Sequence, residues 1–358
     1  MRRLAIVGTG LIGASIGLAA KHAGVAEVVG TDADEESIRI ALDRGAIDAA
    51  ADDVDADLVV VAVPVAQLPA RVRDVLEQTR DATVTDVGST KGAVVAAAGG
   101  DARFVGGHPV CGSEARGPAH ANGELFRGAT WFLTPMAYTD PDRYRTLHGF
   151  VSSLGAQPVA IDPRAHDRLV AMTSHLPHVL ANVVLNQAGA TRVEGHDPLA
   201  AAGGSLRDMT RVAGANPRIW VDIFLDNAGA IRESLAEHRR RIEQVEDALA
   251  QGDAGYLARW IAEAAGNRRT MLADAYPDAT DLYRVRVHVP DRPGVLAGIT
   301  QALGAERINI EDFELRHVSA ERGGTLIVLV TGAEQAERAA ALLEAQGYGV
   351  VVSAVEES

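Results

Sequence analysis

Three glycines recur in the segment Gly8-Thr9-Gly10-Leu11-Ile12-Gly13, which follows an aliphatic run at residues 4–7 and opens an apolar helical pattern. A strand that turns through three such glycines into a helix is the context in which dinucleotides bind. The first glycine permits the tight turn, the second lets a pyrophosphate approach the backbone, and the third allows close helix packing. We therefore expect a dinucleotide site made of Gly8, Gly10, Leu11, Ile12 and Gly13.

A carboxylate ends the second predicted strand. Asp32 follows the glycines by about twenty residues, where such a side chain can hydrogen-bond a ribose 2′-hydroxyl. No basic residue lies between Asp32 and Arg39 that would neutralise a 2′-phosphate. The pattern favours NAD over NADP as the cofactor. A glycine-rich turn without a ligand is the alternative.

Short aliphatic runs alternate with helical patterns through the first part of the chain. The runs cover residues 4–7, 28–30, 58–63, 83–87 and 104–105. This spacing is typical of parallel strands joined by helices, so we predict a doubly wound α/β sheet of the Rossmann type. We assign it to an NAD-binding domain over residues 1–162.

The rest of the chain shows two other patterns. Residues 165–187 and 216–250 are rich in alanine and leucine, which predicts an all-helical middle domain over residues 163–275. Residues 283–289 then alternate polar and apolar side chains as a half-buried strand does. The order that follows is strand, helix, strand, strand, helix, strand, a ferredoxin-like arrangement over residues 282–358, with the linker at 276–280.

The composition narrows the class of protein. Acidic residues outnumber basic ones, 48 to 34, and the net charge of −14 argues against nucleic acid or an anionic membrane as a partner. A single cysteine, Cys111, excludes an intramolecular disulfide and fits the reducing cytoplasm. Glycines interrupt the first apolar run too early for a signal peptide, and no run of about 18 apolar residues predicts a membrane span. We assign no metal ligands.

Two polar segments follow later strands, Asp86-Val87-Gly88-Ser89-Thr90-Lys91 and Gly106-Gly107-His108-Pro109-Val110-Cys111-Gly112-Ser113-Glu114. The carboxyl ends of parallel strands face the ligand crevice, so we expect Ser89 and His108 beside the reacting groups. Histidine suits the acceptance of a proton near neutral pH while a hydride leaves the same carbon. From the residues alone, a structural His108 is as well supported as a catalytic one. Cys111 is interpreted as a small packing residue.

A third polar cluster interrupts the helical section. It contains Ser174-His175-Leu176-Pro177-His178, then Arg207, Arg211 and Trp220. Such side chains are costly to bury unless they are paired, which suggests an anion site where an arginine fork binds a carboxylate. The alternative is that Arg207 and Arg211, four residues apart, lie on a solvated helix face with Asp208 as a partner.

In order and spacing these clusters resemble the prephenate dehydrogenase family over most of the first 275 residues. The resemblance implies NAD-dependent oxidative decarboxylation of prephenate to 4-hydroxyphenylpyruvate in tyrosine biosynthesis, by a homodimer. It implies that His108 takes a hydrogen bond from the ring hydroxyl of the substrate, and that Ser89 contacts the nicotinamide side and His108. Arg211 would grip a carboxylate, which leaves Arg207 a structural role. The other substrate-binding residues that it implies are His178, Ser113, Glu114 and Trp220.

The segment Asp291-Arg292-Pro293-Gly294-Val295-Leu296, followed by Arg307-Ile308-Asn309-Ile310, resembles an ACT domain. Such domains commonly bind amino acids at paired interfaces. The resemblance implies feedback by tyrosine, with contacts from Gly294, Val295, Leu296, Asn309 and Ile310. An ACT domain that only promotes assembly is the alternative.

Three other functions compete with the main interpretation. Arogenate dehydrogenase would use the same residues, and Glu114 could attract the ammonium group of arogenate or pair with Arg116. A hydroxyacid dehydrogenase with an ACT domain would leave the His-Pro and Ser-His-Leu-Pro-His segments without a role. A non-catalytic NAD and amino-acid sensor is of a different class, and the joint presence of Ser89, His108, His178 and Arg211 argues against it.

Overall fold

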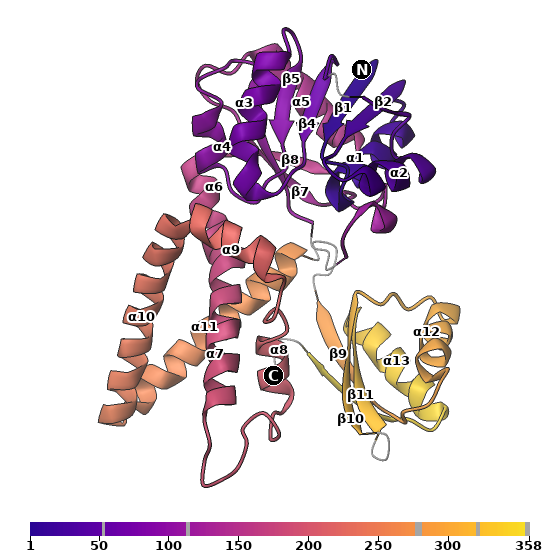
Figure 1. Cartoon of the computed structure of the whole chain (residues 1–358). Helices are drawn as coiled ribbons and strands as arrows, with labels where there is room; N and C mark the ends of the chain where they lie inside the picture. The colour runs from indigo at the N-terminus through magenta and orange to yellow at the C-terminus, as the bar shows by residue number, and fades with distance from the viewer. Residues whose placement is uncertain (52–53, 112–114, 276–280, 320–322, 355–358) are drawn as a thin grey trace. The chain divides into compact units, whose positions relative to one another are not determined.

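The computed structural model describes residues 1–51, 54–111, 115–275, 281–319 and 323–354 (Figure 1). The chain forms two compact units, Met1–Arg240 and Arg241–Ser358. The boundary between them falls within the long helix α10 (Ala228–Gln251). Within the described ranges, no helix combines the length and apolar character needed to cross a membrane.

An eight-stranded sheet organises the first unit, in the order β3-β2-β1-β4-β5-β6-β7-β8. Neighbouring strands are parallel except for β6 and β7, which are antiparallel. The strands are β1 (Arg3–Val7), β2 (Glu27–Thr31), β3 (Ala49–Ala50), β4 (Leu58–Val61), β5 (Thr83–Asp86), β6 (Phe104–Pro109), β7 (Thr130–Thr134) and β8 (Gln157–Ala160). The predicted Rossmann-type sheet is confirmed, and β3, β7 and β8 are strands beyond the five predicted runs.

Both faces of this sheet are covered by helices, as Figure 1 shows. Alternate residues of β1 point to opposite faces: Leu4 and Ile6 pack with α1 and α5, whereas Ala5 and Val7 pack with α3 and α4. The continuous apolar runs of the strands are explained by burial on both faces. The helical elements are α1 (Leu11–His22), α2 (Glu35–Asp43), η1 (Val65–Gln67), α3 (Leu68–Gln78), α4 (Gly92–Ala97), η2 (Pro118–His120) and α5 (Pro141–Ser153).

The middle section is helical, as the sequence predicts. Asp162 caps the start of the first of these helices, and Pro163 occupies its first position. Asn216 and Pro217 begin a later helix in the same way. The elements are α6 (Pro163–Val170), η3 (Ala171–His175), α7 (Leu176–Ala190), α8 (Gly204–Met209), α9 (Pro217–Asp226) and α10. The element η3 is a π-helical turn between α6 and α7, a feature that often occurs at functional sites.

The second unit contains α11 (Ala254–Ala275) and an antiparallel four-stranded sheet in the order β10-β11-β9-β12. Val285, Val287 and Val289 alternate with exposed residues along β9 and pack with Ile299 and Leu303 of α12. The elements are β9 (Leu282–Val289), α12 (Val295–Ala305), β10 (Asp312–Ser319), β11 (Gly323–Thr331), α13 (Ala333–Ala345) and β12 (Gly349–Ala354). This is the predicted ferredoxin-like order.

Candidate active site

The glycine loop joins β1 to α1 in the way that the sequence predicts. Gly8 has a φ of +98°, and a Cβ there would lie 2.5 Å from the carbonyl oxygen of Ala62. A Cβ on Gly13 would lie 1.9 Å from the carbonyl oxygen of Gly8. Gly10 differs, because nothing lies within 4 Å of its Cβ position. Two of the glycines therefore serve the packing of the chain, and Gly10 leaves open backbone at the start of α1.

Asp32 lies directly after β2 and beside this loop. The backbone N–H of Thr9 donates to Asp32 Oδ2 at 2.7 Å, and that of Asp34 donates to Oδ1 at 3.0 Å. Leu11 and Ile12, in the first turn of α1, are half-buried. The loop and the carboxylate are thus held together as one local structure.

A buried ion pair fastens the ends of β5 and β6. Lys91 Nζ pairs with Asp86 Oδ2 and donates to the carbonyl oxygen of Gly107 at 2.8 Å, and both charged side chains are fully buried. Asp86 also accepts from the backbone N–H groups of Gly88 at 2.8 Å and Gly107 at 3.1 Å. Burial lowers the pKa of Lys91, and the charge of Asp86 opposes that shift. The network fixes the backbone next to His108.

His108 is half-buried near the end of β6. Its Nδ1 lies 2.9 Å from Nε2 of His166, and no other described group hydrogen-bonds to the ring. Burial holds the pKa of His108 well below its usual value, and the charge of Lys91 lowers it further. His108 is therefore neutral near pH 7 with one nitrogen, Nε2, left for a reacting group. This is the state that a proton acceptor requires.

His166 and Asp167 bring α6 to the ends of the sheet. His166 has no solvent exposure, and its Nδ1 lies 2.9 Å from Asp167 Oδ1. The Asp167 carboxylate also accepts from the backbone N–H groups of Lys91 and Gly92, each at 2.8 Å. One polar network thus joins three segments that are far apart in sequence: β6, α6, and the first residues of α4.

A third histidine, His175, joins this network from the π-helical turn. Asn227 Nδ2 donates to the carbonyl oxygen of Asp167 at 2.8 Å and lies 3.1 Å from His175 Nδ1. Because a carbonyl oxygen only accepts, the amide nitrogen faces both groups, and His175 Nδ1 is an acceptor. Burial lowers the pKa of His175 to about 4. His175 is consequently neutral, with its proton on Nε2.

His178 and Trp220 form a stacked aromatic pair one turn further along α7. Their ring centroids lie 3.5 Å apart at an interplanar angle of 28°. Burial lowers the pKa of His178, and the nearby positive charge of Arg211 also disfavours its protonation. Arg211 itself is exposed and lies beyond the end of α8. The predicted substrate-binding residues His178, Arg211 and Trp220 therefore gather at one place.

Other predicted site residues are less closely connected. Ser89 is half-buried after β5, and it forms no hydrogen bond with His108 in the part of the chain that the structure describes. Arg207 is exposed on α8. Because α8 ends at Met209, Arg211 does not lie on the same helix as Arg207. Ser113 and Glu114 lie outside the described residues. Cys111 packs against the apolar core, and burial raises its pKa to about 11, so its thiol is neutral.

Sequence reasoning missed His166, Asp167 and Asn227. Each lies in a stretch that the sequence predicts as ordinary amphipathic helix. Apart from the adjacent pair His166–Asp167, their side-chain partners are between 52 and 76 residues away in sequence. One usable signal was present, since a His-Asp pair follows a predicted helix start at Asp162-Pro163. A buried histidine with an acidic neighbour in that place would have merited assignment.

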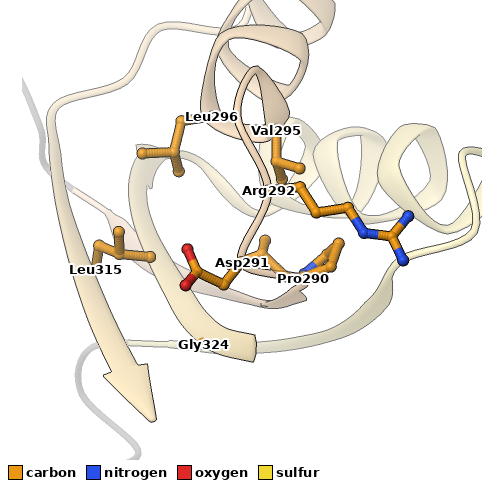
Figure 2. A pocket seen from close by; sticks show the side chains of 8 residues that line it. Pro290, Asp291, Arg292, Val295, Leu296, Leu315 and Gly324 are labelled. Atoms are coloured by element: carbon orange, nitrogen blue, oxygen red, sulfur yellow. The ribbon is translucent and has the colours of Figure 1, made fainter. Parts of the chain in front are cut away.

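A pocket also lies beside the four-stranded antiparallel sheet of the second unit. Figure 2 shows Asp291, Leu296 and Leu315 directed towards a common space, whereas the guanidinium of Arg292 points away from it. Of the residues predicted to contact a regulatory ligand, Val295 and Leu296 line this pocket. Gly294 begins α12 with a left-handed backbone, Asn309 donates to Glu311 at 2.8 Å, and Ile310 packs against the core. The full lining is Val289, Pro290, Asp291, Arg292, Val295, Leu296, Leu315 and Gly324.

Three family models match most of the chain, from residue 16 to residue 347. Residues 16–160 match the nucleotide-binding domain of prephenate dehydrogenase, and residues 162–263 match its dimerization domain. Residues 283–347 match the ACT domain.

Individual relatives agree with this assignment. The chain is 34% identical to a prephenate dehydrogenase of Bacillus subtilis over 95% of each chain. It is 31% identical to a cyclohexadienyl dehydrogenase of Zymomonas mobilis, covering 76% of this chain and 97% of the relative.

Solved structures resemble about three quarters of the chain. The structure of prephenate dehydrogenase from Aquifex aeolicus with hydroxyphenyl propionate and NAD+ has a TM-score of 0.72 at 28% identity, covering 76% of this chain and 98% of that one. Arogenate dehydrogenase of Synechocystis has a TM-score of 0.69, also at 28% identity, covering 75% and 99%. With its nucleotide-binding, dimerization and ACT domains in this order, the chain belongs to the prephenate dehydrogenase family of oxidoreductases.

Proposed function

We propose that the chain is an NAD-dependent prephenate dehydrogenase that converts prephenate to 4-hydroxyphenylpyruvate and carbon dioxide. The observation that carries the proposal is the environment of His108, a neutral imidazole at the carboxyl end of β6 with Nε2 unengaged by described groups. In an open α/β sheet this edge borders the nicotinamide. A base in that position suits a substrate that loses a hydroxyl proton as its ring carbon is oxidised.

The residues present fit a dinucleotide cofactor. Gly10 has no neighbour near its Cβ position at the start of α1, and Asp32 is held beside the loop by Thr9. Gly8, Gly10, Leu11, Ile12 and Gly13 would hold the pyrophosphate, and Asp32 would bind a ribose hydroxyl and disfavour a 2′-phosphate. When bound, NAD accepts the hydride from the substrate carbon.

The chain's own residues divide the remaining work. His108 Nε2 accepts the proton of the ring hydroxyl, and Arg211 binds a carboxylate of the substrate beside the His178–Trp220 pair. Ser89 borders the nicotinamide. Loss of carbon dioxide restores aromaticity in the substrate ring, so the protein mainly positions the groups that react.

The test is the initial rate of NADH formation by the purified full chain with prephenate, with NAD and with NADP. We expect NADH formation with NAD, and a fall in kcat of about 10² to 10⁴ in His108→Asn with unchanged NAD affinity. His148→Asn is a matched control, because His148 is exposed on α5 and contacts only Tyr144 among described rings. Normal turnover in His108→Asn would exclude the assigned base.

Arogenate is a second candidate substrate, because the chain resembles both an arogenate dehydrogenase and a cyclohexadienyl dehydrogenase. Arogenate differs from prephenate by an amine in place of the side-chain keto group. Parallel assays with the two substrates at equal concentrations discriminate between them by the ratio of their kcat/KM values. A larger value for arogenate would reassign the substrate and leave the role of His108 unchanged.

The ACT domain supports a further proposal, feedback inhibition by tyrosine. Its pocket combines the apolar side chains of Val295, Leu296 and Leu315 with the carboxylate of Asp291. An amino acid with an aromatic side chain suits such a mixture. Titration of NADH formation with tyrosine, with Leu296→Asp as the variant, tests it. Equal inhibition of both proteins would move the tyrosine site elsewhere.

We propose that the chain forms a homodimer, since its middle section matches a dimerization domain. We also propose that this dimer is cytoplasmic, because a single cysteine fits a reducing compartment. Large apolar side chains are exposed on its helices, among them Leu225 at 72% and Ile261 at 60%. Light scattering coupled to size-exclusion chromatography would give the mass of the particle. A monomer at micromolar concentration would contradict the proposal.

A further inference from the structure

A continuous hydrogen-bonded chain of three side chains ends at His108. Asp167 Oδ1 lies 2.9 Å from His166 Nδ1, and His166 Nε2 lies 2.9 Å from His108 Nδ1. We propose that Asp167 and His166 are positioning residues that fix the tautomer of His108 and leave its Nε2 unprotonated for the substrate. The consequence for turnover rests on the proposed function, whereas the proton positions do not.

The proton positions follow from Asp167. An ionised carboxylate only accepts hydrogen bonds, and this one also accepts from the backbone of Lys91 and Gly92. Burial raises the pKa of Asp167, but its hydrogen bonds outweigh burial and hold the pKa below its usual value. An ionised Asp167 requires the proton of His166 to be on Nδ1.

A neutral His166 then offers a lone pair at Nε2. The 2.9 Å contact with His108 Nδ1 needs one proton, which His108 must supply. The Nε2 of His108 is left as the basic nitrogen. If His166 were instead doubly protonated, the assignment would reverse and His108 Nε2 would carry the proton. The two arrangements place the proton of His108 on different nitrogens, so a spectrum of the ring nitrogens distinguishes them.

The rings are also fixed in orientation. Phe132, which pairs with His108 across the β6–β7 ladder, contacts the His166 ring edge-on at a centroid distance of 5.4 Å. Asn227 donates to the carbonyl oxygen of Asp167 and so holds the backbone of α6. Neither ring can flip to exchange its nitrogens without breaking this packing and a buried hydrogen bond.

This arrangement gives His108 two properties that a base needs. Before reaction, the bare Nε2 accepts the substrate proton: the O–H bond breaks as the N–H bond at Nε2 forms. Afterwards, both nitrogens of the imidazolium carry protons, and the Nδ1–H still donates to His166, which is supported by the Asp167 carboxylate. A third group that orients a catalytic histidine has the same effect in hydrolase triads.

The first test reads the proton positions directly in the resting protein. Long-range ¹⁵N–¹H correlation spectra of the ¹⁵N-labelled chain distinguish protonated from bare ring nitrogens, and the His108 signals are those lost in His108→Asn. We expect a protonated Nδ1 and a bare Nε2 at pH 7. A proton on Nε2 of His108 would overturn the proposal whether or not the chain oxidises prephenate.

The second test compares two replacements of His166. His166→Gln can present an amide oxygen to His108 Nδ1, whereas His166→Phe keeps a planar ring and removes the acceptor. We expect kcat to fall by about 10²-fold in His166→Phe and to stay within about tenfold in His166→Gln, with the KM for NAD unchanged in both. His166→Phe should also shift His108 towards the Nε2-protonated form in the spectra.

Two results would count against the positioning role. One is equal loss of turnover in both variants together with an unaltered His108 tautomer, which indicates a merely structural His166. The other is normal turnover in His166→Phe. If His166→Phe fails to fold, the spectrum of the unmodified protein still decides the proposal, because it requires no variant of His166.

Discussion

Lys91 and Asp86 form a fully buried ion pair whose ammonium also donates to the carbonyl oxygen of Gly107, the residue before His108. The pair therefore connects two strand ends and the backbone of the proposed base. Its carboxylate has three donors, from Lys91, Gly88 and Gly107, so its charge is compensated although both side chains are fully buried. A buried charge loses this compensation when one partner is removed.

We expect Lys91→Met to destabilise the first unit strongly. An uncompensated buried carboxylate costs roughly 3 to 5 kcal/mol. At about 2 to 4 °C per kcal/mol for a domain of this size, the melting temperature should fall by at least about 6 °C. The double variant Lys91→Met, Asp86→Asn removes both charges and should recover part of the loss. Differential scanning calorimetry measures both, and a double variant less stable than the sum of the single variants would contradict the pairing.

The pH dependence of kcat/KM should reflect the environment of His108. Burial, followed by the charge of Lys91, holds the pKa of His108 well below its ordinary value of 6.5. The base is active when neutral, so activity should persist as the pH falls through 6.5 and be lost only at a lower pH, where His108 takes up a proton. An acid limb centred near 6.5 in rate profiles would show that His108 is not the group observed.

Lys91→Met provides the comparison for that profile. Removing the ammonium removes one of the causes that lower the pKa of His108. The acid limb should therefore move to higher pH in any Lys91→Met protein that remains folded at the assay temperature. A limb that stays in place would indicate that Lys91 has no electrostatic effect on the base.

Two glycines of the same loop should respond differently to alanine. In Gly13→Ala the new Cβ would lie 1.9 Å from the carbonyl oxygen of Gly8. That oxygen belongs to the backbone, so the clash can be relieved only if β1 or α1 moves. In Gly10→Ala the new Cβ meets nothing within 4 Å. We expect Gly13→Ala to lose both thermal stability and NAD binding, and Gly10→Ala to keep its melting temperature within about 2 °C but bind NAD at least about tenfold more weakly. Calorimetric titration with NAD and thermal melts separate the two effects, and normal NAD affinity in Gly10→Ala would place the pyrophosphate elsewhere.

The fold and the cofactor loop could be predicted because their signals are local. The glycines, Asp32 and the aliphatic runs each report a backbone requirement within about twenty residues. The strands β3, β7 and β8 lie outside the five predicted aliphatic runs.

The polar network around His108 could be predicted only in part. His108, His178 and Arg211 stand in recognisable motifs, but the contact of His108 with His166 joins residues 58 apart. Nothing in the periodicity of α6 distinguishes a histidine that faces solvent from one that is fully buried against another strand end. Such contacts are set by how α6 packs on the sheet, which is a tertiary property. The contact between Ser89 and His108 that the family resemblance implies stays a prediction, whereas the partner of His108 Nδ1 among the described residues is His166.

Arg211 and Arg207 allow the proposed anion site to be tested with a matched pair. Both are exposed arginines four residues apart, but Arg211 lies close enough to His178 for its charge to lower the pKa of that imidazole. A substrate carboxylate beside the His178–Trp220 stack would therefore meet Arg211, and water would be displaced from the pair of charges on binding.

We expect Arg211→Ala to raise the KM for prephenate by the equivalent of about 2 to 5 kcal/mol of binding free energy, and Arg207→Ala to change it little. Steady-state kinetics at saturating NAD measures this, and Arg211→Lys should restore only part of the loss because an ammonium cannot form the bidentate contact. A KM that is normal in Arg211→Ala and raised in Arg207→Ala would assign the carboxylate to α8 instead.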